Sequence, residues 1–259
     1  MTFGRTAWLM ARHFARDVIA SRRTLVLSGF LLLAAVIFGV AGLAMGEDTG
    51  DRLGLYFLFL YTCVAGIGLQ FACQAYGLAA TSDEIESGAA VYLFTRPLPR
   101  PAILAGRLLA AWAVVSLAFV VLALPVSFAL LGARGLSAFL PTAAIVVAAA
   151  GCYVCVFALL GLLTRHALLA GLLFVVFWEQ PISMLPVAVK SLSIKYHLLC
   201  AVRAWVTAPF GQPFPGDEMV EQCEGGGTAA LVTVAVVAVV MAGLALQRMR
   251  KVEILRSSG

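Results

Sequence analysis

The chain has 259 residues, of which 62% are hydrophobic and only 12% are charged. A soluble domain is about half apolar and about a quarter charged, so the composition predicts an all-α polytopic membrane protein. The net charge of +5 would suit nucleic acid only if the basic residues shared one exposed face, and most of them flank apolar segments instead. We therefore expect a lipid bilayer as the surroundings and exclude nucleic acid as a partner. The preference for Arg over Lys suggests a bacterial source.

Residues 3–23 precede the first apolar segment and have a helical period. Arg5, Arg12, Arg16 and Arg23 fall on one side, and apolar side chains fall on the other. This pattern predicts an interfacial helix over residues 1–23 that lies on the inner leaflet. The alternative, a disordered basic tail, would not need that period.

Six apolar segments have the length of a membrane span. They cover approximately residues 24–46, 54–80, 102–131, 137–163, 167–189 and 228–247. The fifth is the least regular, because Glu179, Gln180, Pro181 and Pro186 interrupt it. We expect one transmembrane domain over residues 1–259: five spans within 24–180, an outer segment at 181–227, the last span and a tail at 248–259.

The basic residues predict the orientation. With the N-terminus inside, 13 of the 18 Lys and Arg residues lie in inner segments. Both termini are then cytoplasmic, as an even number of spans requires. We expect the bacterial cytoplasmic (inner) membrane as the location.

The outer segment predicts short interfacial or partly re-entrant helices over 187–206, followed by a loop rich in Pro and Gly. Cys200 and Cys223 both fall in this segment, so a disulfide between them is a hypothesis. The other four cysteines lie within apolar spans, where we interpret them as small packing residues rather than a metal or redox site.

Several catalytic devices are missing from the sequence. A nucleotide-binding P-loop needs Gly-Lys before Ser or Thr, and the three lysines follow Val, Ile and Arg. The three histidines have no zinc spacing, and no Gly-x-Ser-x-Gly motif occurs. We expect no catalytic residue, no metal and no cofactor in this chain.

Residues 81–107 form a charged elbow between the second and third spans. Thr81 and Glu84 have capping-box spacing, and the acidic residues that follow favour a helix N-terminus. The prolines after Arg96 form a stiff turn, and Pro101 suits the first position of the next helix. A solvated loop obeying the positive-inside rule would explain the arginines, but not the acids, the cap or the prolines.

The elbow resembles the signature of type-2 ATP-binding-cassette permeases. The resemblance rests on Glu84-Ile-Glu-Ser-Gly-Ala-Ala-Val-Tyr-Leu-Phe-Thr-Arg-Pro-Leu-Pro-Arg and Ile103-Leu-Ala-Gly-Arg107, with Ala89 where Thr is usual. Phe177-Trp178-Glu179 and Leu192-Ser-Ile-Lys-Tyr-His197 are similar to a second family pattern. One family branch serves maturation of a copper enzyme, but no Met or His cluster here favours that branch.

The resemblance implies that residues 82–94 form a coupling helix, which would sit in a cleft of a separate ATPase subunit. ATP and Mg would bind to that partner, and two copies of this chain would pair with two ATPases. The coupling residues would be Ser82, Asp83, Glu84, Ile85, Glu86, Ser87, Gly88, Tyr92, Arg96 and Arg100. A periplasmic partner is left open.

Polar residues inside spans are costly and are therefore candidates for a transport path or gate. These are Gln70, Gln74, Trp178 and Glu179. Interhelical hydrogen bonding is the alternative for the two glutamines. For Glu179 we expect that the side chain orders the outer gate or caps the re-entrant helix.

The sequence thus favours a permease subunit of an ATP-driven exporter. An ion-coupled carrier is one alternative, although such carriers usually have repeated halves and several ionisable groups at the midplane. A membrane anchor or assembly protein that docks a soluble partner is another. The cargo cannot be inferred from these residues.

Overall fold

The computed structural model describes residues 3–44, 49–81, 100–182, 188–207 and 226–251, together with Phe210 and Cys223. These residues are almost entirely helical, and no strand occurs among them. Most of the predicted coupling residues, from Ser82 to Arg96, lie outside the described part of the chain. Arg100 lies at the start of a helix, but its side chain is not among those described.

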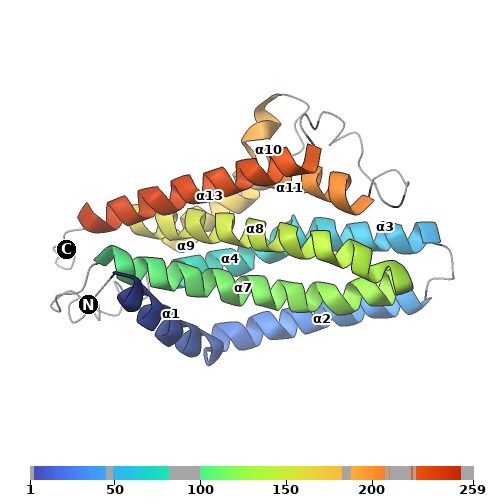
Figure 1. Cartoon of the computed structure of the whole chain (residues 1–259), viewed down its shortest axis with the longest axis horizontal. Helices are drawn as coiled ribbons and strands as arrows, with labels where there is room; N and C mark the ends of the chain where they lie inside the picture. Colours follow the sequence, from blue (N-terminus) through green and yellow to red (C-terminus); the bar gives the residue numbers. More distant parts are fainter. Residues whose placement is uncertain are drawn as a thin grey trace.

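The long helices lie side by side in one elongated bundle (Figure 1). Four helical stretches are long and apolar enough to cross a membrane, and a fifth, Ala167–Ile182, is apolar but shorter. One of the four, Pro101–Leu163, is two helices: α7 (Arg100–Leu131) and α8 (Gly135–Leu163) are joined by a 3-10 turn, η2 (Gly132–Arg134), and pack against each other. These apolar helices are those of a membrane protein.

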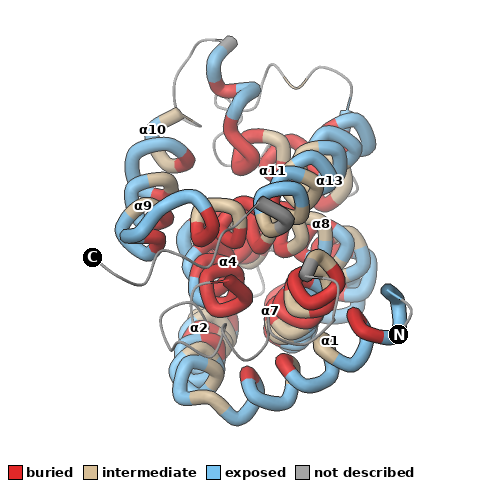
Figure 2. The backbone as a smooth tube through the Cα atoms, turned by 90° about the vertical axis from the view of Figure 1, so that its left-hand side faces the viewer, coloured by how far each residue is buried: buried red, intermediate tan, exposed pale blue. Residues whose placement is uncertain are grey.

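Burial separates the helices at the centre of the bundle from those at its periphery. In an 18-residue apolar part of each helix, 72% of the residues are buried for the second stretch, Gly50–Ala79. The corresponding share is 22% for α2 (Arg22–Ala44) and 17% for the last helix, α13 (Gly226–Lys251). Figure 2 shows the same contrast end-on, with α4 mostly buried and α2 at the margin. The peripheral helices expose apolar side chains, as expected where the neighbour is lipid or another membrane helix.

The second stretch is broken near its middle. It consists of α3 (Thr49–Phe59), a π-helical turn η1 (Leu60–Val64) and α4 (Ile67–Ala79). At the break, the backbone passes so close to the preceding turn that a Cβ at Gly66 would collide with the carbonyl oxygens of Tyr61 and Thr62, so only glycine fits there. Within a membrane such a break leaves backbone groups unpaired, and the Gln70 side chain donates to the Ala65 carbonyl at 3.5 Å.

The N-terminal helix α1 (Phe3–Ile19) lies obliquely across one end of the bundle (Figure 1). Its buried face includes Ala7, Phe14 and Val18, whereas Phe3 in the first turn is 52% exposed. Gly106 of α7 allows the crossing, since a Cβ there would meet the backbone of Ala7. The start of α1 and the end of α13 lie at the same end of the bundle.

The fifth segment and the outer segment are made of short pieces. The described part of the fifth comprises α9 (Ala167–Leu173), the π-helical η3 (Phe174–Glu179) and α10 (Gln180–Ile182), and the predicted stretch from 183 to 187 lies outside the described residues. Residues 188–207, which we call the cap segment, comprise η4 (Ala188–Leu192), α11 (Ile194–Val202) and the π-helical η5 (Arg203–Thr207). The short helices predicted over 187–206 are therefore present.

Candidate functional site: a buried charged cluster beneath the cap segment

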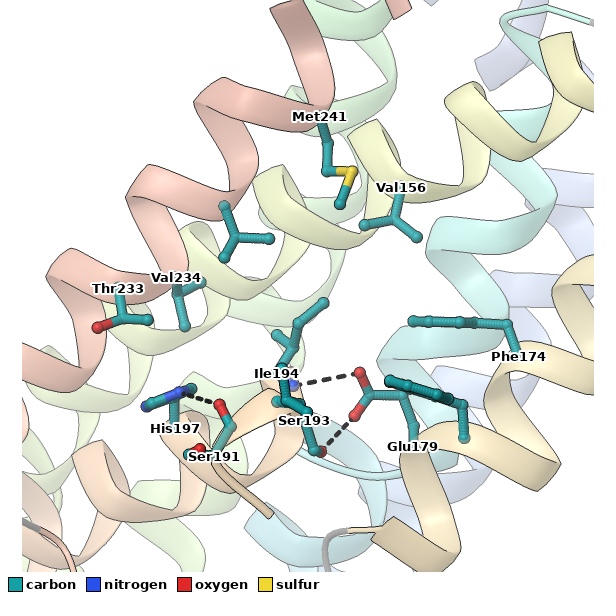
Figure 3. A pocket seen from close by; sticks show the side chains of 13 residues that line it. Val156, Phe174, Glu179, Ser191, Ser193, Ile194, His197, Thr233, Val234 and Met241 are labelled. Atoms are coloured by element: carbon teal, nitrogen blue, oxygen red, sulfur yellow. Dashed lines mark hydrogen bonds between the residues drawn. The ribbon is translucent and has the colours of Figure 1, made fainter. Parts of the chain in front are cut away.

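Glu179 caps the N-terminus of α11. Its side chain is fully buried, and its carboxylate accepts hydrogen bonds from the Ser193 hydroxyl at 2.7 Å and the Ile194 N–H at 3.2 Å (Figure 3). It also accepts one from the Lys195 N–H at 3.1 Å. The first N–H groups of a helix have no partner within the helix, and the helix dipole favours an anion there. Helix capping, one of the two roles predicted for Glu179, is thus what its contacts provide.

The side-chain amine of Lys195 lies near this buried carboxylate and places a positive charge close to it. The Lys195 side chain is 1% exposed, and its Nζ donates to Gln180 Oε1 at 2.6 Å and to the Tyr61 hydroxyl at 3.3 Å. The amine also lies 4.5 Å from the centre of the Tyr61 ring. Burial lowers the pKa of the Lys195 amine, and the Glu179 carboxylate opposes that shift.

The polar contacts continue into the core of the bundle. Gln180 Nε2 donates to Gln70 Oε1 at 3.2 Å, and Gln70 Nε2 donates to the Tyr153 hydroxyl of α8 at 2.9 Å. We call Glu179, Gln180, Ser193, Lys195 and Gln70 the Glu179 cluster. It connects the cap segment, the fifth segment, α4 and α8, and the break before α4 is what brings Tyr61 and Gln70 to it.

The structure brings together only some of the predicted path residues. Gln70 and Glu179 belong to the Glu179 cluster. Gln74 lies one turn away and donates to the Leu168 carbonyl at 2.7 Å, while its Oε1 is buried without a hydrogen-bond partner among the described residues. Trp178 is 43% exposed and lies outside the cluster. Both glutamines therefore make the interhelical hydrogen bonds that were the alternative to a path-lining role.

Sequence reasoning missed Lys195, which it counted as one more charge of the outer segment. The sequence did hold one signal, because serine is a preferred N-cap residue and could have marked the start of a helix at Ser193. In the structure Ser193 is the N-cap of α11: its backbone is extended and its hydroxyl accepts from the Tyr196 N–H at 3.4 Å. A lysine two positions after an N-cap lies in the first helical turn. Its burial depends on the broken helix beside it, which the apolar pattern did not reveal.

A disulfide joins the cap segment to the chain that precedes α13. Cys200 of α11 and Cys223 are bonded, with 5.8 Å between their Cα atoms. This is the pair that the sequence offered as a hypothesis. The remaining cysteines, Cys63, Cys73, Cys152 and Cys155, are free thiols, and no group of metal-binding side chains occurs within the described ranges.

A cavity of about 310 Å³ lies beside the Glu179 cluster. Figure 3 shows its walls, which come from η3, the cap segment, α8 and α13. Most of the wall is apolar, and Glu179, Ser191, Ser193, His197 and Thr233 contribute the polar groups. Trp178 lines its edge.

Comparison with known proteins leaves the family open. The chain matches no protein-family model, and no curated protein matches it significantly.

Proposed function

We propose that this chain is the membrane-spanning subunit of an ATP-binding-cassette exporter, driven by a separately encoded ATPase. The observation that carries the proposal is the motif from Glu84 to Arg100, followed by Ile103–Arg107, at the connection between two long apolar helices. The chain itself has no P-loop lysine, so the nucleotide would bind to the partner.

In this proposal the chain crosses the membrane six times. The crossings are α2, the broken helix from α3 to α4, α7, α8, the short segment from α9 to α10, and α13. An even number of crossings fits the position of the chain ends at one end of the bundle (Figure 1). The excess of basic residues in the inner segments favours the cytoplasm for that end.

Contacts around the elbow support a mechanical role. Arg107, the last residue of the motif, donates through Nη1 to the Ala80 carbonyl at the end of α4, at 3.3 Å. Its guanidinium also lies 5.4 Å from the centre of the Phe14 ring of α1. One side chain therefore holds α1, α4 and α7 together where the elbow begins and ends. A push on the elbow would reach all three helices.

The proposal is tested by removing the elbow's acids. Glu84→Ala combined with Glu86→Ala should lower the amount of ATPase that co-purifies with the chain by about tenfold, the size expected when a few charged contacts to a partner are lost. The ATPase to use is the one encoded nearest to this chain in its genome. The matched control is Glu47→Ala with Asp48→Ala, an acidic pair in the first outer loop, which should have no effect. Equal loss from both pairs would contradict a docking role.

One observation favours a second candidate, an ion-coupled carrier. Glu179 and Lys195 are both buried among apolar helices, where ionisable groups often mark ion paths. Proteoliposomes containing the chain alone separate the two functions. Uptake or release driven by a proton or sodium gradient without ATPase would favour the carrier, whereas transport that needs the ATPase and ATP would favour the exporter.

A further inference from the structure

We propose that the cavity between η3, the cap segment, α8 and α13 is a binding site for a hydrocarbon chain of a membrane lipid. This inference depends only on the protein lying in a bilayer, and it is independent of the proposed ATPase partner.

The cavity floor is buried and apolar. Val234 of α13 is 1% exposed, Val156 of α8 is 6% exposed and Ile194 of α11 is 7% exposed. On α13 the lining residues run from Thr233 to Met241, which is about 12 Å along a helix. Its volume of about 310 Å³ lies at the lower end of the range for sites that bind small molecules.

The buried polar groups beside this floor already have hydrogen-bond partners. Both oxygens of Glu179 accept hydrogen bonds from the cap segment, and the Ser193 hydroxyl is one of the donors. A bound water needs two to four polar partners, and a polar ligand would have to compete with these bonds. An apolar ligand would leave these hydrogen bonds in place.

The rim of the cavity is exposed and largely apolar. Leu192 is 64% exposed and Trp178 is 43% exposed. Neighbouring residues of α13 that do not line the cavity, Val236 and Val240, are also half-exposed or more. The cavity therefore opens onto a surface that faces lipid in a bilayer, and lipid hydrocarbon is the medium available to fill it.

An occupant would press against the Glu179 cluster. Phe174 and Glu179 come from the fifth segment, while Ser193 and Ile194 come from the cap segment, and all four line the same cavity (Figure 3). A lipid chain bound here would fill the space between the two segments that Glu179 joins. Lipid occupancy should therefore stabilise the cap segment in the position that the structure shows.

The test uses the full chain in phosphatidylcholine vesicles. A trace of phosphatidylcholine with a diazirine midway along one acyl chain is included, and irradiation attaches it to residues it touches. Peptide mass spectrometry then measures labelling at Val156 and Val234, which bulk lipid cannot reach. Leu117 of α7, 65% exposed, reports labelling by bulk lipid.

A matched pair of variants decides the outcome. Val237 lines the cavity, whereas Val236, its neighbour on α13, is 56% exposed and does not. We expect Val237→Trp to reduce labelling of Val156 and Val234 by about tenfold, because the indole fills the cavity, and to leave Leu117 unchanged. Val236→Trp should leave all three sites labelled as in the unchanged chain. Retention of the Cys200–Cys223 disulfide shows that each variant is folded.

Three results would overturn the proposal. The first is absence of cavity labelling in the unchanged chain while Leu117 is labelled. The second is equal labelling of the cavity in both variants. The third is cross-linking of the cavity peptides to a second copy of the chain instead of lipid, which would make this face a contact between copies. Loss of ATPase binding would bear on the proposed function and leave the lipid site untouched.

Discussion

Among the described residues, two buried polar clusters can be compared that differ in charge. Near the break in the second stretch lies the Glu179 cluster, which contains a carboxylate and an amine. Elsewhere, Tyr56 of α3 contacts the hydroxyls of Ser127 at 3.0 Å and Thr142 at 2.9 Å, and all three residues are fully buried. We call these three the hydroxyl cluster.

The difference indicates which part of the molecule can move. The hydroxyl cluster joins α3 to the two long helices α7 and α8 and carries no charge, so its hydrogen bonds contribute little to the free energy of unfolding. The Glu179 cluster joins short helical pieces and holds two charges out of water. A buried pair of charges is stable only while both partners and their hydrogen bonds stay in place. A displacement of the cap segment would therefore break contacts of the Glu179 cluster before those of the hydroxyl cluster.

Glu179→Ala is expected to have the largest effect on stability and tests the difference between the two clusters most severely. It removes the acceptor for Ser193, Ile194 and Lys195 and leaves the Lys195 amine buried without its counter-charge. We expect the free energy of unfolding to fall by about 3–5 kcal/mol, the usual cost of breaking a buried charged pair. Reversible unfolding in mixed micelles of increasing SDS content measures it.

Two controls accompany that variant. Glu179→Gln keeps one acceptor oxygen and should cost less, while still reducing transport and leaving subunit assembly intact. Glu179→Gln combined with Lys195→Met removes both charges and should recover part of the loss seen with Glu179→Ala. A loss below about 1 kcal/mol for Glu179→Ala would mean that the carboxylate is dispensable.

The disulfide provides an intermediate effect. Cys200→Ser with Cys223→Ser removes a link across a sequence separation of 23 residues, and we expect a loss of about 3 kcal/mol on unfolding. Non-reducing peptide mass spectrometry first establishes the bond, and free thiols at both positions would remove the premise. Because the link joins the cap segment to the chain before α13 and does not involve α3, α7 or α8, contacts within the hydroxyl cluster should be unaffected.

The smallest effect is expected at the hydroxyl cluster. Tyr56→Phe removes one hydroxyl, but Ser127 keeps its hydrogen bond to the Ala123 carbonyl at 2.7 Å. Hydrogen bonds between membrane helices average well under 1 kcal/mol, so we expect a loss of about 0.5–1 kcal/mol in the same SDS titration. A loss as large as that of Glu179→Ala would abolish the distinction between the two clusters.

Much of the helical layout could be predicted from apolar length alone. Five of the six predicted segments correspond to helices whose ends lie within a few residues of the prediction. The break at Gly66 could not be predicted, because the apolar run continues through it. Glycine is required there only because the carbonyl oxygens of Tyr61 and Thr62 lie close by in the folded chain. The π-helical turn η3 within the fifth segment could not be predicted either, because the apolar run continues through Phe174–Val176 without a break.

Only some residues of the candidate site could be identified from the sequence. Gln70 and Glu179 stood out because polar groups are rare in apolar runs. Lys195 did not, because a lysine in an outer segment is ordinary, and its burial depends on contacts with Tyr61 and Gln180 from distant parts of the chain. The roles predicted for the elbow residues stay predictions, since residues 82–99 lie outside the described part of the chain.

The central claim is that the elbow contacts an ATPase, and site-directed cross-linking tests it most directly. Ser87→Cys introduces a thiol into the elbow, and Ser137→Cys introduces one in the first turn of α8, a helix that starts at the opposite end of the bundle from the start of α7 (Figure 1). Each variant is made in a chain whose four free cysteines are replaced, is co-expressed with the neighbouring ATPase, and is treated with a short thiol-to-amine cross-linker. We predict a cross-link to the ATPase from Ser87→Cys and none from Ser137→Cys. A stable complex that cross-links through Ser137→Cys, or through neither position, would contradict the account.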